Sequence, residues 1–142
     1  MTYQASPSSQ ALLAAAGRIL LAAIFLYSGI FKALKPHNTI ADIVYSGLPF
    51  PLLGLALAVA IEVGAGAMLA LGFKTRLAAL GLALFALFSA LAFHHDIGER
   101  VHLMHLLRNF AIAGGLLQVI AFGAGAYSLD ALTGRKRVAQ AA

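Results

Sequence analysis

A single carboxylate interrupts a long apolar stretch near the middle of the chain. In LAVAIEVGAGAMLALG, residues 57–72, Glu62 is the one charged side chain among fifteen uncharged neighbours. A charge at the centre of a membrane span costs roughly 2.5–3.5 kcal/mol on insertion scales, so it requires a partner or a bound proton. Glu62 is therefore the first candidate for proton chemistry.

Arg18 is a second charge inside an apolar run, and Lys32 lies fourteen residues further along the same helical stripe. At 1.5 Å per residue, Arg18 and Glu62 lie roughly 10 and 14 Å from the ends of their spans on one membrane side. We therefore expect Arg18 to be the partner of Glu62 on an antiparallel neighbouring helix. The pair acts either as a catalytic proton-handling site, with Glu62 as relay, or as a structural link between two helices.

A second polar group surrounds the connection between the last two apolar runs. Its members are His94, His95, Asp96, Glu99, His102, His105, Arg108 and Asn109. His102, His105 and Asn109 share one helical face because they are spaced i, i+3 and i+7. Arg108 has no acidic partner within its span, so it suits a carboxylate, a sulfur oxyanion, a quinone oxygen or a lipid phosphate.

Metal, haem and dinucleotide sites have little support in this pattern. Zinc needs three or four converging ligands, and the HExxH motif is missing. A membrane haem uses axial histidines on facing helices, whereas this polar group lies at one end of the bundle. Gly64 and Gly66 do not complete GxGxxG. The chain has no cysteine, which excludes thiol relays and iron–sulfur ligation. No metal site is assigned.

The elements that position these residues must be membrane helices. Of 142 residues, 61% are hydrophobic and only 11% are charged, whereas a soluble domain is nearer a quarter charged. The net charge of +5 is explained by basic loops, so nucleic acid is not an expected partner. Stretches of about 20 apolar residues predict four spans, at residues 11–31, 52–71, 77–93 and 103–122. The fold class is therefore all-α, a four-helix transmembrane bundle forming one domain over residues 1–142.

A short additional helix is expected at the membrane interface, at about residues 39–46. Thr39 and Asp42 resemble a capping box that begins it, and Gly47 ends it. Pro51 then suits the first turn of the second span.

The basic residues outside the spans predict an orientation. Five lie on the side shared by both termini: Lys74, Arg76, Arg135, Lys136 and Arg137. Three lie on the other side: Lys32, Lys35 and Arg100. Because Lys and Arg accumulate in cytoplasmic loops, we expect both termini to be cytoplasmic.

Taken together, these segments resemble the DoxX family of small bacterial inner-membrane proteins, in its YphA-like branch. The matching pieces, in order, are RILLAAIFLYSGIFK (18–32), GLPFP (47–51), IEVGAGAMLALGFKTR (61–76), HHD (94–96), RNFAIAGGLL (108–117) and GAGAYSLD (123–130). By this resemblance Arg18 and Lys32 take family positions in the first span and Glu62 takes one in the second. His94 or His95 matches the histidine after the third span. Asn109 matches the fourth span, and Arg108 stands where many members carry Lys.

The resemblance implies a bundle of four packed helices in the inner membrane, with the lipid bilayer as its constant partner. Some members are similar to a subunit of a thiosulfate:quinone oxidoreductase, which implies a quinone-linked redox accessory with a partner redox protein or a homo-oligomer. In that case His94, His95, His105, Arg108, Asn109 and Lys32 would bind the ligand. The alternatives are a scaffold without chemistry and a permease for protons or small solutes.

Overall fold

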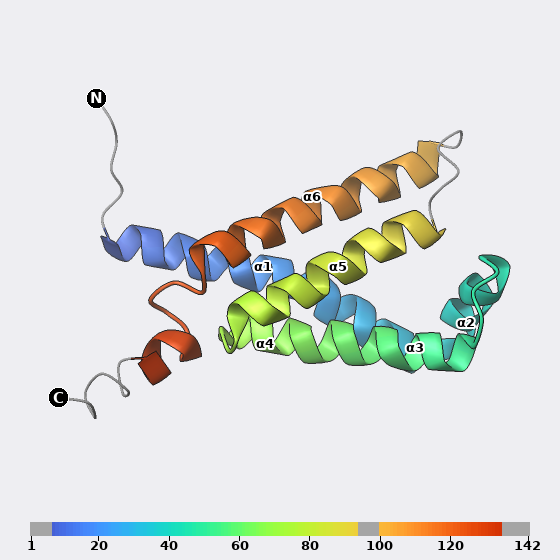
Figure 1. Ribbon diagram of the computed structural model, residues 1–142, viewed down its shortest axis with the longest axis horizontal. Coiled ribbons are helices and arrows are strands. Elements are labelled where there is room, and N and C mark those ends of the chain that lie inside the picture. Colours follow the sequence, from blue (N-terminus) through green and yellow to red (C-terminus); the bar gives the residue numbers. More distant parts are fainter. Residues whose placement is uncertain (1–6, 94–99, 135–142) are drawn as a thin grey trace.

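The computed structural model describes residues 7–93 and 100–134 (Figure 1). Within these ranges the chain is helical and contains no strand, and four helices are long and apolar enough to cross a membrane. The spans are Ser8–Leu34, Pro51–Leu71, Thr75–Phe93 and Arg100–Phe122. The predicted all-α fold with four membrane spans is therefore confirmed, although the first and last spans each extend about a turn beyond the predicted bounds.

The helices follow one another as an up-and-down bundle. The first span is α1 (Pro7–Leu34), and the second consists of three consecutive segments: α3 (Pro51–Val59), the π-helix η1 (Ala60–Ala65) and α4 (Gly66–Leu71). The remaining spans, α5 (Thr75–Phe93) and α6 (Arg100–Phe122), pack along each other as a hairpin (Figure 1). The α1 helix packs along the second span, with α2 (Pro36–Tyr45) near their shared end.

The α2 helix begins earlier than the sequence pattern predicts. Its first turn contains Pro36, and its N-cap residue Lys35 makes no side-chain capping hydrogen bond. Thr39 lies inside the helix, so the predicted capping box is wrong. Proline has a fixed φ and lacks an N–H, so it suits a first helical turn and also ends α1 before it. Gly47, with φ 73°, follows the end of α2 as predicted.

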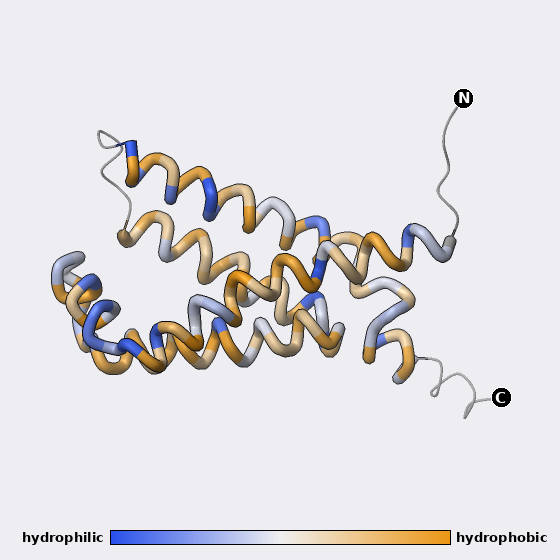
Figure 2. Tube along the Cα trace, turned by 180° about the vertical axis from the view of Figure 1, so that it is seen from behind, coloured by the Kyte–Doolittle hydropathy of each residue, from blue (hydrophilic) through white to orange (hydrophobic). Residues whose placement is uncertain are grey.

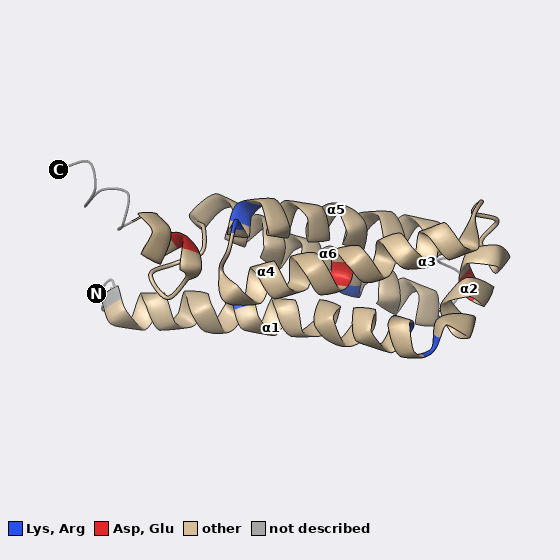
Figure 3. Cartoon of the chain, turned by 90° about the horizontal axis from the view of Figure 1, so that it is seen from below, with Lys and Arg blue, Asp and Glu red and all other residues tan. Residues whose placement is uncertain are grey.

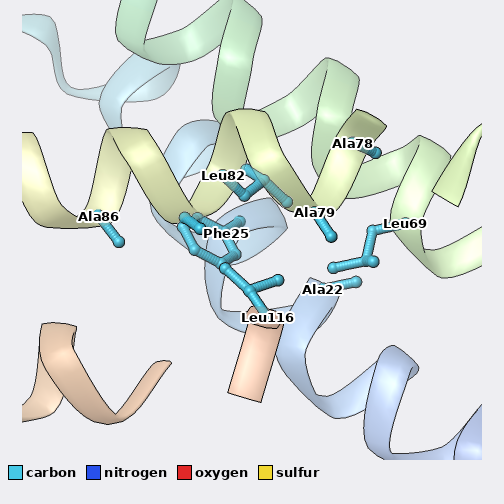
Figure 4. Close-up of a cluster of buried hydrophobic side chains, with 9 residues drawn as sticks. Ala22, Phe25, Leu69, Ala78, Ala79, Leu82, Ala86 and Leu116 are labelled. Atoms are coloured by element: carbon cyan, nitrogen blue, oxygen red, sulfur yellow. The ribbon is translucent and has the colours of Figure 1, made fainter. Parts of the chain in front are cut away.

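The buried core is formed mostly by small side chains. Ala79, Ala83, Ala86 and Ala90 follow one another along a single face of α5, and all are buried. Small residues allow membrane helices to approach closely, because van der Waals packing holds such helices together. Figure 4 shows Ala79 and Ala86 of this face beside larger side chains contributed by α1, α4 and α6.

The outward faces suit contact with lipid. Large apolar side chains of all four spans are exposed, for example Leu20, Leu57, Leu84 and Leu117. Figure 2 shows hydrophobic residues along the length of the four long helices, and Figure 3 shows that charged residues are sparse there. The few charges that do lie within the bundle therefore need individual explanations.

Candidate functional site

Glu62 is held by Lys32, and the predicted Arg18–Glu62 pair is wrong. The Lys32 Nζ atom donates to both Glu62 carboxylate oxygens, at 2.8 Å to Oε1 and 2.7 Å to Oε2. The same ammonium also donates to Ser28 Oγ at 2.6 Å. Glu62 is only 4% exposed, so this ion pair places a charged carboxylate inside the bundle.

The register between α1 and the second span explains why Lys32 and not Arg18 reaches Glu62. Gly29 lies directly opposite Glu62, and a Cβ atom there would come within 2.9 Å of Glu62 Cβ. Arg18 lies opposite Gly72 instead, about 21 Å along the helix from Lys32. The N-terminal part of α1 extends past the end of α4 (Figure 1). The depth of Arg18, counted from the start of α1, and that of Glu62, counted from the end of α4, are therefore measured from different levels and cannot be compared.

Glu62 also lies in the π-helical segment η1, Ala60–Ala65. Short π segments inside α-helices are frequent at functional sites, since they redirect side chains at a local cost in hydrogen bonding. The hydropathy and spacing of AIEVGA do not distinguish a π turn from an α turn, so the sequence pattern gave no signal for it. The segment turns Glu62 inward, toward α1.

The Lys32–Glu62 pair lines a cavity of about 1130 Å³, called here the Glu62 cavity. Apolar lining comes from Phe25, Phe85 and Phe88, among others. Further polar lining comes from Ser28, Asp42, Ser89, His102, Arg108 and Asn109. The cavity is large enough for a drug-sized ligand, and it combines an apolar wall with a few converging polar groups, as ligand sites commonly do.

The structure thus brings four of the predicted site residues together, namely Lys32, Glu62, Arg108 and Asn109. His105 does not line the cavity, whereas His102 from the preceding turn of α6 does. His94 and His95 lie outside the described residues. Their predicted role in ligand binding remains a prediction.

Asp42 is a lining residue that the sequence pattern assigned only to helix capping. It lies on α2, next to the buried Ile43 that packs against Gly54 of α3. The amphipathic pattern of α2 was the available signal for Asp42. An amphipathic helix beside a bundle turns its polar residues toward the aqueous or polar space next to it.

The charges that line the cavity balance one another. Among its described lining residues, Lys32 and Arg108 are cationic and Asp42 and Glu62 are anionic. The Lys32 charge is already engaged by Glu62, so Arg108 is the cation that remains available, and it is exposed. A balanced cavity suits a neutral ligand with hydrogen-bond acceptors better than it suits an anion.

Arg18 belongs to a separate cluster at the opposite end of the bundle. Its guanidinium donates to the backbone oxygens of Ala124 at 2.7 Å and Tyr127 at 2.9 Å. Gly72 makes room for it, because a Cβ at this position would lie 2.5 Å from Arg18 Nη1. Arg18 therefore fastens the segment after α6 to α1, which is an architectural role.

Asp130 completes this cluster by capping α5. Its carboxylate accepts hydrogen bonds from Lys74 N at 2.8 Å, Thr75 N at 2.9 Å and Thr75 Oγ1 at 2.7 Å. Burial acts to raise the pKa of the Asp130 carboxyl, but these hydrogen bonds and the attraction of Arg18 outweigh it. The pKa therefore lies below its ordinary value.

Four apolar helices around a cavity that is lined by an ion pair with a buried carboxylate define a small multi-pass membrane protein with an intramembrane polar site. The family model for DoxX matches residues 13–95, which is more than half of the chain. The chain belongs to the DoxX family, as the resemblance of its motifs predicted.

Two relatives support this assignment and the location in the inner membrane. Inner membrane protein YqjF of Escherichia coli (strain K12) is 34% identical over 119 residues, covering 84% of this chain and 90% of YqjF. Inner membrane protein YphA of the same organism is 34% identical over 118 residues, covering 80% of this chain and 84% of YphA. The chain is therefore a multi-pass inner-membrane protein. No solved structure gives a significant match.

Proposed function

We propose that this protein is a quinone-binding component of a membrane redox system and that the quinone ring occupies the Glu62 cavity. The single observation that carries the proposal is the cavity itself, in which the buried Glu62, its half-buried partner Lys32 and the cation Arg108 lie together with apolar side chains. Its lining comes from all four membrane spans, which suits a ligand that is dissolved in the bilayer.

The chemistry of a quinone head group matches this lining. A quinone is flat and neutral, and its two carbonyl oxygens accept hydrogen bonds. Arg108 and Asn109 offer N–H donors from α6. Phe25, Phe85 and Phe88 provide apolar contacts for the ring and for the start of its hydrocarbon tail.

Reduction of the quinone to a quinol adds two electrons and two protons. A partner redox protein would supply the electrons. The protons would come from water: Glu62, whose carboxylate lines the cavity, would take up one proton at a time and pass it to the nearer quinone oxygen. The Lys32 ammonium would in addition stabilise negative charge that develops on the reduced ring before the protons arrive.

Binding of decylubiquinone to the purified protein in a mild detergent tests the first part of the proposal. We expect Arg108→Ala to weaken binding about tenfold or more, because it removes a charged donor from the cavity. Arg100→Ala is the matched control, since Arg100 lies on the same helix but does not line the cavity. Calorimetric titration that finds no binding to the wild type, or equal losses in both variants, would overturn the proposal.

The scaffold alternative is favoured by one observation, namely that Arg18 donates only to backbone oxygens among residues 7–93 and 100–134. The variant Glu62→Gln separates the two functions, because glutamine preserves the side-chain shape and one acceptor for Lys32. If Glu62 relays protons, the variant folds and binds quinone but loses quinol formation in membranes that contain the electron donor. Unchanged activity per folded protein would show that Glu62 is architectural.

A further inference from the structure

A second cavity, of about 640 Å³, lies at the end of the bundle where α5 begins and α6 ends. It is called here the Lys74 cavity. Residues 74–77 line one side, and residues from Gly123 to Ala131 line the other. This cavity belongs to neither the Lys32–Glu62 pair nor the proposed quinone site.

Two cationic side chains, Lys74 and Arg76, line the Lys74 cavity. Arg76 Nη2 makes only a long contact, 3.5 Å, to the Ala121 carbonyl oxygen. The Lys74 Nζ atom lies 5.7 Å from the centre of the Phe73 ring. Both cations thus retain hydrogen-bond donors for a ligand.

The carboxylate in the same wall does not cancel these charges. Both oxygens of Asp130 already accept hydrogen bonds from Lys74 N and from Thr75, and the nearby Arg18 charge balances that of Asp130. Among the described lining residues, the positive charges of Lys74 and Arg76 therefore remain uncompensated.

The backbone holds the two cations around an open space. Lys74 adopts a left-handed conformation with φ 43°, and Gly123 and Gly125 have φ 82° and 77°. A Cβ at Gly123 would lie at an ordinary van der Waals distance of 3.7 Å from Arg76 Nη2, so glycine is required here for its positive φ and not for space.

We propose that the Lys74 cavity binds the phosphate group of an anionic ligand, and that the ligand is a phospholipid. Arginine and lysine are the usual donors to phosphate oxygens. The cavity lies at the boundary of two membrane spans, where lipid head groups are located. Leu77 in the same wall is apolar and 63% exposed, so it can contact an acyl chain below the head group. A free phosphate would leave Leu77 unused.

Thermal unfolding of the purified protein in detergent tests this site with three probes: dioleoyl phosphatidylglycerol, dioleoyl phosphatidylcholine and inorganic phosphate. We expect phosphatidylglycerol to raise the melting temperature in a saturable manner and phosphatidylcholine to have little effect. The double variant Lys74→Gln/Arg76→Gln should require at least tenfold more phosphatidylglycerol for half of the maximal shift.

The matched control is Lys35→Gln/Arg100→Gln, which removes the same number of charges away from this cavity. Lys35 also lies over an aromatic ring, that of Phe31, as Lys74 does over Phe73. This control should keep the wild-type response, and every variant retains the basic residues at 135–137.

Each outcome decides the proposal. A shift produced by inorganic phosphate alone and lost in Lys74→Gln/Arg76→Gln would assign the site to a soluble phosphate. Equal responses to the two lipids, or equal losses in the two double variants, would overturn the site. If the double variant fails to fold, the single variant Arg76→Gln is used, with native mass spectrometry to count the phosphatidylglycerol molecules that copurify. Fewer bound lipids than in Arg100→Gln would support the site, and equal numbers would contradict it.

Discussion

Arg18 and Lys32 lie on one stripe of α1, yet they bind chemically different partners. Arg18 donates to two backbone oxygens, whereas Lys32 donates to a carboxylate and a hydroxyl. The planar guanidinium is suited to two divergent carbonyl groups, and the compact ammonium is suited to the oxygens of one carboxylate and one hydroxyl around it. Of the two cations, only Lys32 lines the Glu62 cavity.

Gly72 provides the clearest test of the Arg18 cluster. A Cβ there would lie 2.5 Å from both Arg18 Nη1 and Ser128 Cβ, and the backbone has φ 69°. We expect Gly72→Ala to lower the free energy of unfolding by more than about 1 kcal/mol, through strain and through displacement of Arg18. Thermal unfolding in detergent measures the change.

Gly81→Ala is the control, because Gly81 lies within α5 and a Cβ there would meet no atom within 4 Å. Alanine should stabilise this helical position by about 0.5–1 kcal/mol. Equal effects of the two substitutions would contradict the role assigned to Gly72.

At the scale of the helices, the N-terminus of α5 is capped by Asp130, which lies 55 positions after Thr75 in the sequence. Thr75 N donates to Asp130 Oδ2, so the first turn of α5 is capped from beyond the end of α6. Charged caps at a helix N-terminus satisfy otherwise unpaired N–H groups and interact favourably with the helix dipole. The segment after α6 thereby fixes the relative position of α5.

The depressed pKa of Asp130 predicts a dependence of stability on pH. A carboxylate with a folded-state pKa below the unfolded one stabilises the protein above the ordinary pKa of about 3.9, and this contribution is lost as the pH falls further. Asp130→Ala should therefore cost about 0.5–2 kcal/mol at neutral pH and flatten the acid limb of the stability curve. Melting temperatures measured between pH 3 and pH 7 test this. An unchanged acid limb would show that other groups control it.

The helices were predictable from sequence because their causes are local. Long apolar runs define the spans, and Pro51 marks the first turn of the second span as expected. The Lys32–Glu62 pair was not predicted because it depends on the register between two helices. Gly29 sets this register by allowing contact with Glu62. To predict which residues of α1 lie opposite Glu62, matching the small residues on the facing sides of the two helices would have been a better guide than depth counted from the helix ends.

Four residues that line the Glu62 cavity were predicted from the sequence. Glu62, Lys32, Arg108 and Asn109 stand out as polar groups in apolar helices, whatever the packing. The contribution of Asp42 could not be inferred in this way, because it requires α2 to fold back over the cavity. The polar face of α2 is visible in its sequence, but the placement of that face against the cavity depends on tertiary contact, such as Ile43 against Gly54.

At the scale of the whole molecule, residues 123–134 connect two pairs of helices at one end of the bundle. One pair is α1 with the second span, and the other is α5 with α6. This segment holds Arg18 through Ala124 and Tyr127, and the Asp130 N–H donates to Gly72 O at 2.9 Å. Truncation after Phe122 should leave the Arg18 guanidinium without these acceptors, at a cost of roughly 1–3 kcal/mol for a buried donor that loses its partners.

The direction in which Arg18→Met changes the folded yield, in the full chain and in the truncated chain, tests the role of residues 123–134. Arg18→Met should lower the folded yield of the full chain, but raise that of the truncated chain by removing an unsatisfied charge. The monodisperse fraction in size-exclusion chromatography measures both yields. The same direction of change in both backgrounds would contradict the role of the segment.

The π-helical segment at residues 60–65 separates the second span into two halves, α3 and α4, that face different neighbours. A π turn adds a residue relative to an α turn, so α3 and α4 are out of phase by about 100° of rotation. This offset lets α3 direct Gly54 toward α2 while α4 directs Gly66 toward α1. Deleting one residue here would rotate one half-span against its neighbours without changing any hydrophobicity. The number of residues in this segment, and not only their types, therefore sets how the second span packs.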